Sequence, residues 1–141
     1  MAKSQERDAR GVSAWREETA NDLAAAANGI ESVLGSLTGE PSEDQVRSVW
    51  YAYTGVEKSI AFIKIDLDEE NPGRFIRLRN YKVPDERQAL QFALKNLRKG
   101  TDAFHLGDFR QSLKDLREAR NYLRALLRET RIRRARKART G

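Results

Sequence analysis

The residues of this chain most suited to a chemical role are a block of cations at its C-terminal end, in the sequence LRETRIRRARKARTG. Residues 128–139 hold seven basic residues and a single acid, Glu129. The basic residues are Arg128, Arg131, Arg133, Arg134, Arg136, Lys137 and Arg139. Six of the seven are arginines, whose planar guanidinium groups match the oxygens of a phosphate. Such a cluster is typical of a segment that binds a polyanion.

The charge of the chain is unevenly distributed. The whole sequence contains 27 Lys and Arg against 21 Asp and Glu, a net charge of +6. Residues 128–139 hold 7 of the bases and 1 of the acids, so the rest of the chain holds 20 of each and is neutral overall. A localised basic block indicates an arm for nucleic acid or another acidic partner.

Arginines also recur upstream of the basic block, at steps of three and four residues that place them on one face of a helix. We call these residues the arginine stripe: Arg117, Arg120, Arg124, Arg128 and Arg131. A helix from Phe109 to about Lys137 would be ~43 Å long. After Leu127 the only large apolar residue is Ile132. The last ten or so residues should therefore project from the core, and the arm should continue the stripe.

A second basic patch lies in the sequence GRFIRLRNYK, in a segment that we expect to be extended over residues 74–83. Its aromatic residues, Phe75 and Tyr81, would stack on bases while the cations follow phosphates. Alternatively, the segment is a connector whose apolar side chains pack on the protein. We favour the connector for the aromatic residues and keep the cations as a second contact patch: Arg74, Arg77, Arg79 and Lys82.

The sequence contains few residues suited to disulfide formation, metal binding or catalysis. There is no cysteine, which excludes disulfides and thiolate metal sites. The acidic run at residues 66–71 lacks the glycine and terminal glutamate of an EF-hand loop, so we predict no metal site and no cofactor. Arg98 and the single histidine, His105, resemble the pattern of helical ribonucleases of the HEPN class. That resemblance implies a small ribonuclease as a minor hypothesis, whereas we favour His105 as a partly buried structural residue and predict no catalytic residue.

Apolar periodicity predicts the helices that must position these residues. We expect a first helix capped by Ser13 and ended by Gly39 and Pro41. A second helix should run from about residue 43 to 67, with Ser42 and Gln45 forming a capping box. A rival interpretation is a β-hairpin over residues 60–82, around an Asn-Pro-Gly turn, but the unbroken apolar pattern favours the helix.

The third and fourth helices form a pair in the sequence. Pro84 should be the first residue of the third helix, and Asp108 should cap the fourth after a break at Gly107. The stretch GTDAFHLGDFRQSLKDLREA resembles one tetratricopeptide hairpin, which implies two antiparallel helices and, without a second copy at ~34 residues, no function. The residues that carry the resemblance are Gly100, Gly107, Asp108, Phe109, Ser112, Leu116 and Ala119.

The sequence therefore predicts an all-α protein, a roughly four-helix antiparallel bundle with one long connection at about residues 68–84. Its parts would be a polar N-terminal segment (1–12), the bundle (13–127) and a basic C-terminal arm (128–141). The first residues carry no apolar signal segment, and no apolar run reaches the ~18 residues of a membrane span. We expect a cytoplasmic protein without membrane contact, and the charge-rich composition would also suit a thermophile.

The leading functional hypothesis is a non-catalytic nucleic-acid-binding protein. RNA is favoured over DNA, in an assembly such as the ribosome, because a projecting arginine-rich helix can enter structured RNA. The alternative is a protein–protein adaptor or a self-associating helix. It would use leucines of the last helical hairpin spaced at multiples of seven: Leu106, Leu113 and Leu127.

Overall fold

Four helices make up the part of the chain that the computed structural model describes, residues 2–67 and 85–140. They are α1 (Ala2–Ser36), α2 (Glu43–Asp66), α3 (Glu86–His105) and α4 (Phe109–Thr140). These two ranges contain no strand. The prediction of an all-α protein is confirmed.

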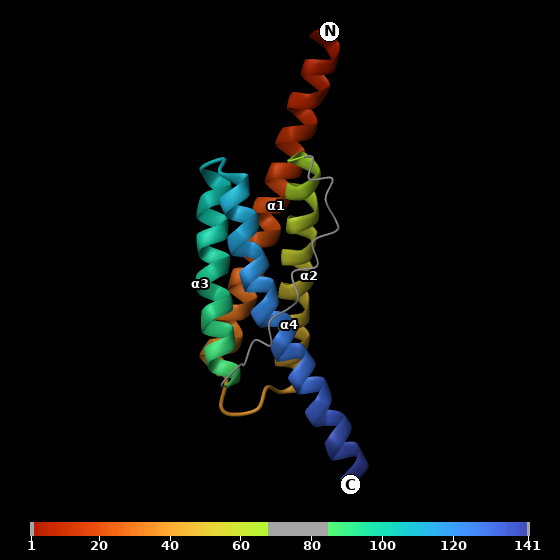
Figure 1. Ribbon diagram of the computed structural model, residues 1–141, viewed down its shortest axis with the longest axis vertical. Coiled ribbons are helices and arrows are strands. Elements are labelled where there is room, and N and C mark those ends of the chain that lie inside the picture. Colours follow the sequence, from red (N-terminus) through yellow and green to blue (C-terminus); the bar gives the residue numbers. More distant parts are fainter. Residues whose placement is uncertain (1, 68–84, 141) are drawn as a thin grey trace.

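The helices form a ring in which each has two neighbours. α1 contacts α2 and α3, and α4 contacts the same two helices from the opposite corner. α1 and α4 run in one direction while α2 and α3 run in the other, so every neighbouring pair is antiparallel (Figure 1). α2 ends and α3 begins at opposite ends of the bundle. The chain therefore needs one long connection, as predicted, whereas the α1–α2 and α3–α4 turns are short.

The core follows the apolar periodicity of the sequence. Each helix turns its three- and four-residue repeat inward, and full burial of one such side chain stabilises the fold by about 1.5–3 kcal/mol. The largest fully buried apolar side chains are Leu23, Ile30, Val49, Val56, Ile63, Leu90, Leu97, Leu113, Leu116, Leu123 and Leu126.

The helix starts are partly as predicted. Ser42 and Gln45 form the expected capping box, with the Gln45 amide donating to Ser42 Oγ at 3.2 Å and the Ser42 amide to Gln45 Oε1 at 2.8 Å. The prediction that Ser13 caps α1 is wrong: the backbone is helical from Ala2, through a segment rich in good helix formers. Asp85, and not Pro84, marks the start of α3. Its carboxylate accepts from the Gln88 amide at 2.7 Å, which is the bond that an N-cap supplies.

The α3–α4 hairpin is built on two glycines. Gly107 adopts a positive φ of 79° in the turn, and Asp108 Oδ1 accepts from the Gln111 amide at 3.3 Å. A Cβ atom on Gly100 would lie 2.8 Å from Leu116 Cδ2, so only glycine permits this approach without a shift. The hairpin that the tetratricopeptide resemblance implied is therefore present.

The alternative β-hairpin is wrong where it can be compared with the structure. Residues 60–66 belong to α2, and Leu67 caps it with an amide bonded to Ile63 O at 3.0 Å. The remainder of that prediction, and the extended segment expected at 74–83, lie outside the described residues.

Candidate nucleic-acid interface

α4 extends beyond the bundle at the end opposite to the start of α1 (Figure 1). It has 32 residues and so spans about 48 Å. Its last fully buried residue is Leu126, and from Arg128 to Arg139 only Thr130 and Arg133 are even half-buried. The prediction that the basic arm projects from the core is confirmed for these residues.

The arginine stripe divides into a tethered part and an exposed part. Arg117 and Arg120 are half-buried, and Arg120 Nε pairs with Glu57 Oε1 of α2 at 3.3 Å. Arg124, Arg128 and Arg131 are exposed and have no ion pair or hydrogen bond with a described residue. Only the second part of the stripe can therefore offer its charges to a partner.

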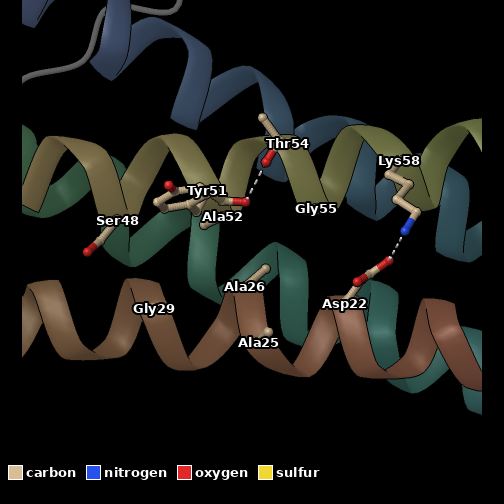
Figure 2. A pocket seen from close by; sticks show the side chains of 10 residues that line it. All are labelled: Asp22, Ala25, Ala26, Gly29, Ser48, Tyr51, Ala52, Thr54, Gly55 and Lys58. Carbon is tan, nitrogen blue, oxygen red and sulfur yellow. Dashed lines mark hydrogen bonds and ion pairs between the residues drawn. The ribbon is translucent and has the colours of Figure 1, made fainter.

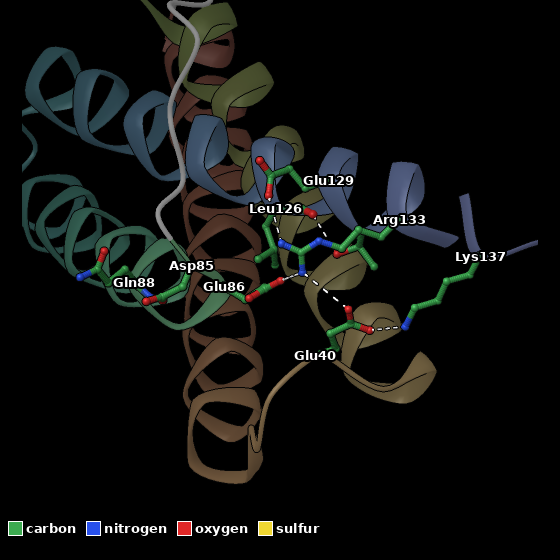
Figure 3. A network of polar contacts seen from close by, with 9 residues as sticks. Glu40, Asp85, Glu86, Gln88, Leu126, Glu129, Arg133 and Lys137 are labelled. Carbon is green, nitrogen blue, oxygen red and sulfur yellow. Dashed lines mark hydrogen bonds and ion pairs between the residues drawn. The ribbon is translucent and has the colours of Figure 1, made fainter. Parts of the chain in front are cut away.

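Two cations of the arm are held by carboxylates at the base of the bundle (Figure 3). We call these three carboxylates, Glu40, Glu86 and Glu129, the acidic clamp. Arg133 contacts all three: it pairs with Glu86, with Glu129 at 3.6 Å and with Glu40 at 4.0 Å. Lys137 Nζ donates to Glu40 Oε2 at 2.7 Å. The clamp joins the arm to the α1–α2 turn and to the start of α3.

The clamp and the exposed arginines lie on different sides of the arm. Arg128 is five residues from Arg133 and Arg131 is two residues from it, which turns both about 140–160° away around the helix. The hydrogen bond and the charge of Lys137 hold the pKa of Glu40 below its usual value, with a further contribution from Arg133. One side of the arm is thus neutralised within the molecule, and the other side is left cationic.

An aromatic pair on α2 adjoins the arginine stripe. Trp50 is stacked on Tyr53, with ring centroids 5.6 Å apart and an interplanar angle of 30°. Burial and the Glu57 carboxylate raise the pKa of Tyr53, while the charges of Arg124 and Arg120 oppose that rise. Trp50 itself is 50% exposed. It is four residues from Val46 and three from Tyr53, so periodicity alone did not separate it from core positions.

The other predicted site residues do not join this surface. Arg74, Arg77, Arg79 and Lys82 lie outside the described residues. Arg98 pairs with Glu31 of α1 at 3.3 Å, and His105 is exposed rather than partly buried. Residues 2–67 and 85–140 hold no group of three His, Cys, Asp or Glu side chains able to bind a metal ion.

A shallow groove of about 400 Å³ lies between α1 and α2 (Figure 2). Small residues such as Ala26, Gly29 and Gly55 form much of its lining and let the two helices approach closely. Its one cation is Lys58, which is paired with Glu18 at 2.5 Å and Asp22 at 3.4 Å. The groove therefore offers no unneutralised charge to a phosphate.

The leucines of the alternative hypothesis do not form one exposed face. Leu106 is 85% exposed, but Leu113 is only 2% exposed and belongs to the core. Leu127 is half-buried and packs against that core. Two of the three leucines, Leu113 and Leu127, thus pack in or against the core, and Leu106 lies outside α4.

Comparisons with protein-family models, with curated proteins and with solved structures find no match for this chain. Among the described helices, none is both long and apolar enough to span a membrane.

Proposed function

We propose that this protein is a non-catalytic nucleic-acid-binding protein that uses the exposed side of α4 to contact phosphates. The contacting residues are Arg124, Arg128, Arg131, Arg134 and Arg139. RNA is favoured over DNA, in a ribonucleoprotein assembly, because an isolated arginine-rich helix projecting from a compact body suits the irregular grooves of folded RNA.

The main support for this proposal is that the cations on one side of the arm are ion-paired, whereas Arg128 and Arg131 on the other side are not paired with any described residue. The acidic clamp neutralises Arg133 and Lys137 and fixes the arm to the bundle. Arg128 and Arg131, on the opposite side, have no such partner in the described part of the chain. Charges that serve only to keep a helix soluble need no fixed orientation. A helix that binds phosphates gains affinity when its cations are held in one direction before binding.

The ribonuclease and adaptor hypotheses have weaker support. Arg98 is engaged with Glu31, so the Arg98–His105 pair is not left to act on a phosphodiester. Leu113, which is central to the adaptor hypothesis, is buried in the core and cannot contact another protein.

The proposal is tested by a salt titration of binding to a labelled RNA hairpin and a labelled DNA duplex. The full chain should bind both at low salt and lose affinity steeply as salt rises, by ~0.9 log units per log unit of salt for each contact with duplex DNA. A chain ending at Leu127 should lose most of the affinity, and its salt dependence should be flatter.

A full chain that fails to bind either probe at 50 mM salt would overturn the proposal. Equal binding by the truncated chain would assign the affinity to another surface. A His105→Ala variant serves as a control. It should bind as tightly as the wild type, and neither protein should cleave the RNA.

A further inference from the structure

Like Tyr51 and Ile65, Trp50 is a large apolar side chain exposed on the surface of α2. Its plane is set by Tyr53, which is half-buried and packed against the core. A ring held in this way can receive a second flat partner at little cost in side-chain entropy.

The register between α2 and α4 places this ring beside the exposed part of the arginine stripe. Glu57 pairs with Arg120, and Tyr53, one turn earlier on α2, is within the electrostatic influence of Arg124. Because α2 and α4 are antiparallel, one further turn toward the N-terminus of α2 corresponds to one further turn toward the C-terminus of α4. That turn contains Trp50 on α2 and residues 127–128 on α4. Trp50 is therefore level with Arg128.

We propose that Trp50 and the exposed arginines of the stripe form one site for unpaired nucleic acid. A base stacks on the Trp50 ring, and the adjoining phosphates lie along Arg124, Arg128 and Arg131. This inference rests on the proposed function and narrows its ligand to a single-stranded segment, since a paired base has no open face for the ring.

Two features of the surface support this ligand. Every base has a π-face, so stacking on an aromatic ring combined with a cationic track is the usual means of holding a single strand. The spacing also fits: successive arginines on one helical face are about 5–6 Å apart, close to the separation of neighbouring phosphates in an extended strand. A protein partner is not favoured, because the neighbouring side of α4 presents the cations Arg124, Arg128 and Arg131.

The molecule offers a matched control in Phe92. This ring is 42% exposed and also lies against a tyrosine, Tyr122, at 5.3 Å and 31°. Tyr122 is two residues from Arg124 and two from Arg120 on α4, about 160° around the helix from both. Phe92 thus provides an exposed ring in contact with a tyrosine on a different side of α4.

The test measures the affinity of the full chain for a 12-nucleotide oligouridine and for an RNA duplex of the same length. Trp50→Ala should weaken oligouridine binding about 5- to 100-fold and change duplex binding less than twofold. Trp50→Phe should retain part of the affinity, and Phe92→Ala should retain all of it. Thermal melts of the three variants establish that each is folded.

Tryptophan fluorescence gives a readout that needs no variant. Trp15 packs against Phe104 and Phe109, which flank the α3–α4 turn. This turn lies at the end of the bundle away from the arm (Figure 1). Oligouridine should quench the emission of the wild type, and this quenching should disappear in Trp50→Phe, which retains Trp15.

The outcomes separate this inference from the proposed function. Salt-sensitive binding of both probes with no effect of Trp50→Ala and no quenching would overturn the single-strand site and leave the phosphate-binding arm. No binding of either probe at 50 mM salt would overturn both. Equal losses in Trp50→Ala and Phe92→Ala would also contradict a specific role for Trp50.

Discussion

The two parts of α4 differ in what holds them in place. From Phe109 to Leu127 the helix is fixed by burial, with Leu113, Leu116, Leu123 and Leu126 in the core. From Arg128 to Arg139 no side chain is fully buried, and ion pairs of Arg133 and Lys137 join the helix to the bundle. One continuous helix thus passes from a region stabilised by apolar contacts to a region stabilised by charge.

This difference indicates which part serves stability and which part serves binding. Buried side chains contribute several kcal/mol each, whereas exposed ion pairs contribute about 0–1 kcal/mol. The arm can therefore lose or exchange its contacts without threatening the fold. A segment of this kind can bind a polyanion through its open side at no cost to the fold.

The largest expected effect is on the buried part. Leu123→Ala should lower the free energy of unfolding by about 2–5 kcal/mol, because the side chain is fully buried and leaves a cavity. Ile132→Ala, on the arm, should change it by less than about 0.5 kcal/mol. Urea denaturation followed by circular dichroism measures both, and similar losses in the two variants would contradict the division of α4.

A smaller effect is expected where α3 supports α4. Gly100→Ala should destabilise the bundle by about 1–3 kcal/mol, because the added methyl group would meet Leu116 and force repacking. Gly35→Ala is the matched control: it is also helical and has no atom within 4 Å of the added Cβ. That variant should be stabilised by about 0.4–1 kcal/mol, and the same denaturation experiment would show whether the two changes have opposite signs.

The smallest effect concerns the clamp and depends on pH. The pKa of Glu40 is lowered by Lys137, so its contribution to docking the arm is fully present above its ordinary pKa and is lost as pH falls through the lowered value. Amide hydrogen exchange of residues 130–138 should accelerate in acid relative to exchange of α4 before Leu127. A Glu40→Gln variant should show the faster exchange already at pH 7, and unchanged exchange there would show that Glu40 does not hold the arm.

The sequence predicted the elements that depend on local pattern. Apolar repeats located the helices, Ser42 and Gln45 identified the start of α2, and Gly107 with Asp108 identified the last turn. The errors at Ser13 and Pro84 arose because several residues near a helix start satisfy the local rules, and tertiary context selects one of them.

The features of the site that the sequence did not reveal depend on contacts between distant segments. Glu40 and Lys137 are 97 residues apart, and no local pattern pairs them. Trp50 is at the edge of the apolar face of α2, and the smaller Ala52 is buried instead. The exposure of Trp50 therefore depends on how α2 packs against the other helices. The basic block was visible in the sequence, but its division into a clamped side and an open side was not.

Two double variants of equal charge test whether the open side of the arm binds phosphates. Arg128→Gln/Arg131→Gln removes two cations from the open side. Arg110→Gln/Lys114→Gln removes two exposed cations from the opposite end of the same helix. Affinity for a labelled RNA is measured for both between 50 and 200 mM salt.

The first double variant should bind about tenfold more weakly at 50 mM salt. Its salt slope should be reduced by the ~1.4–1.8 expected for two lost phosphate contacts. The second should keep the wild-type slope and an affinity within about twofold. Equal losses in the two variants would show that binding follows total charge rather than the open side of the arm, and would contradict the account.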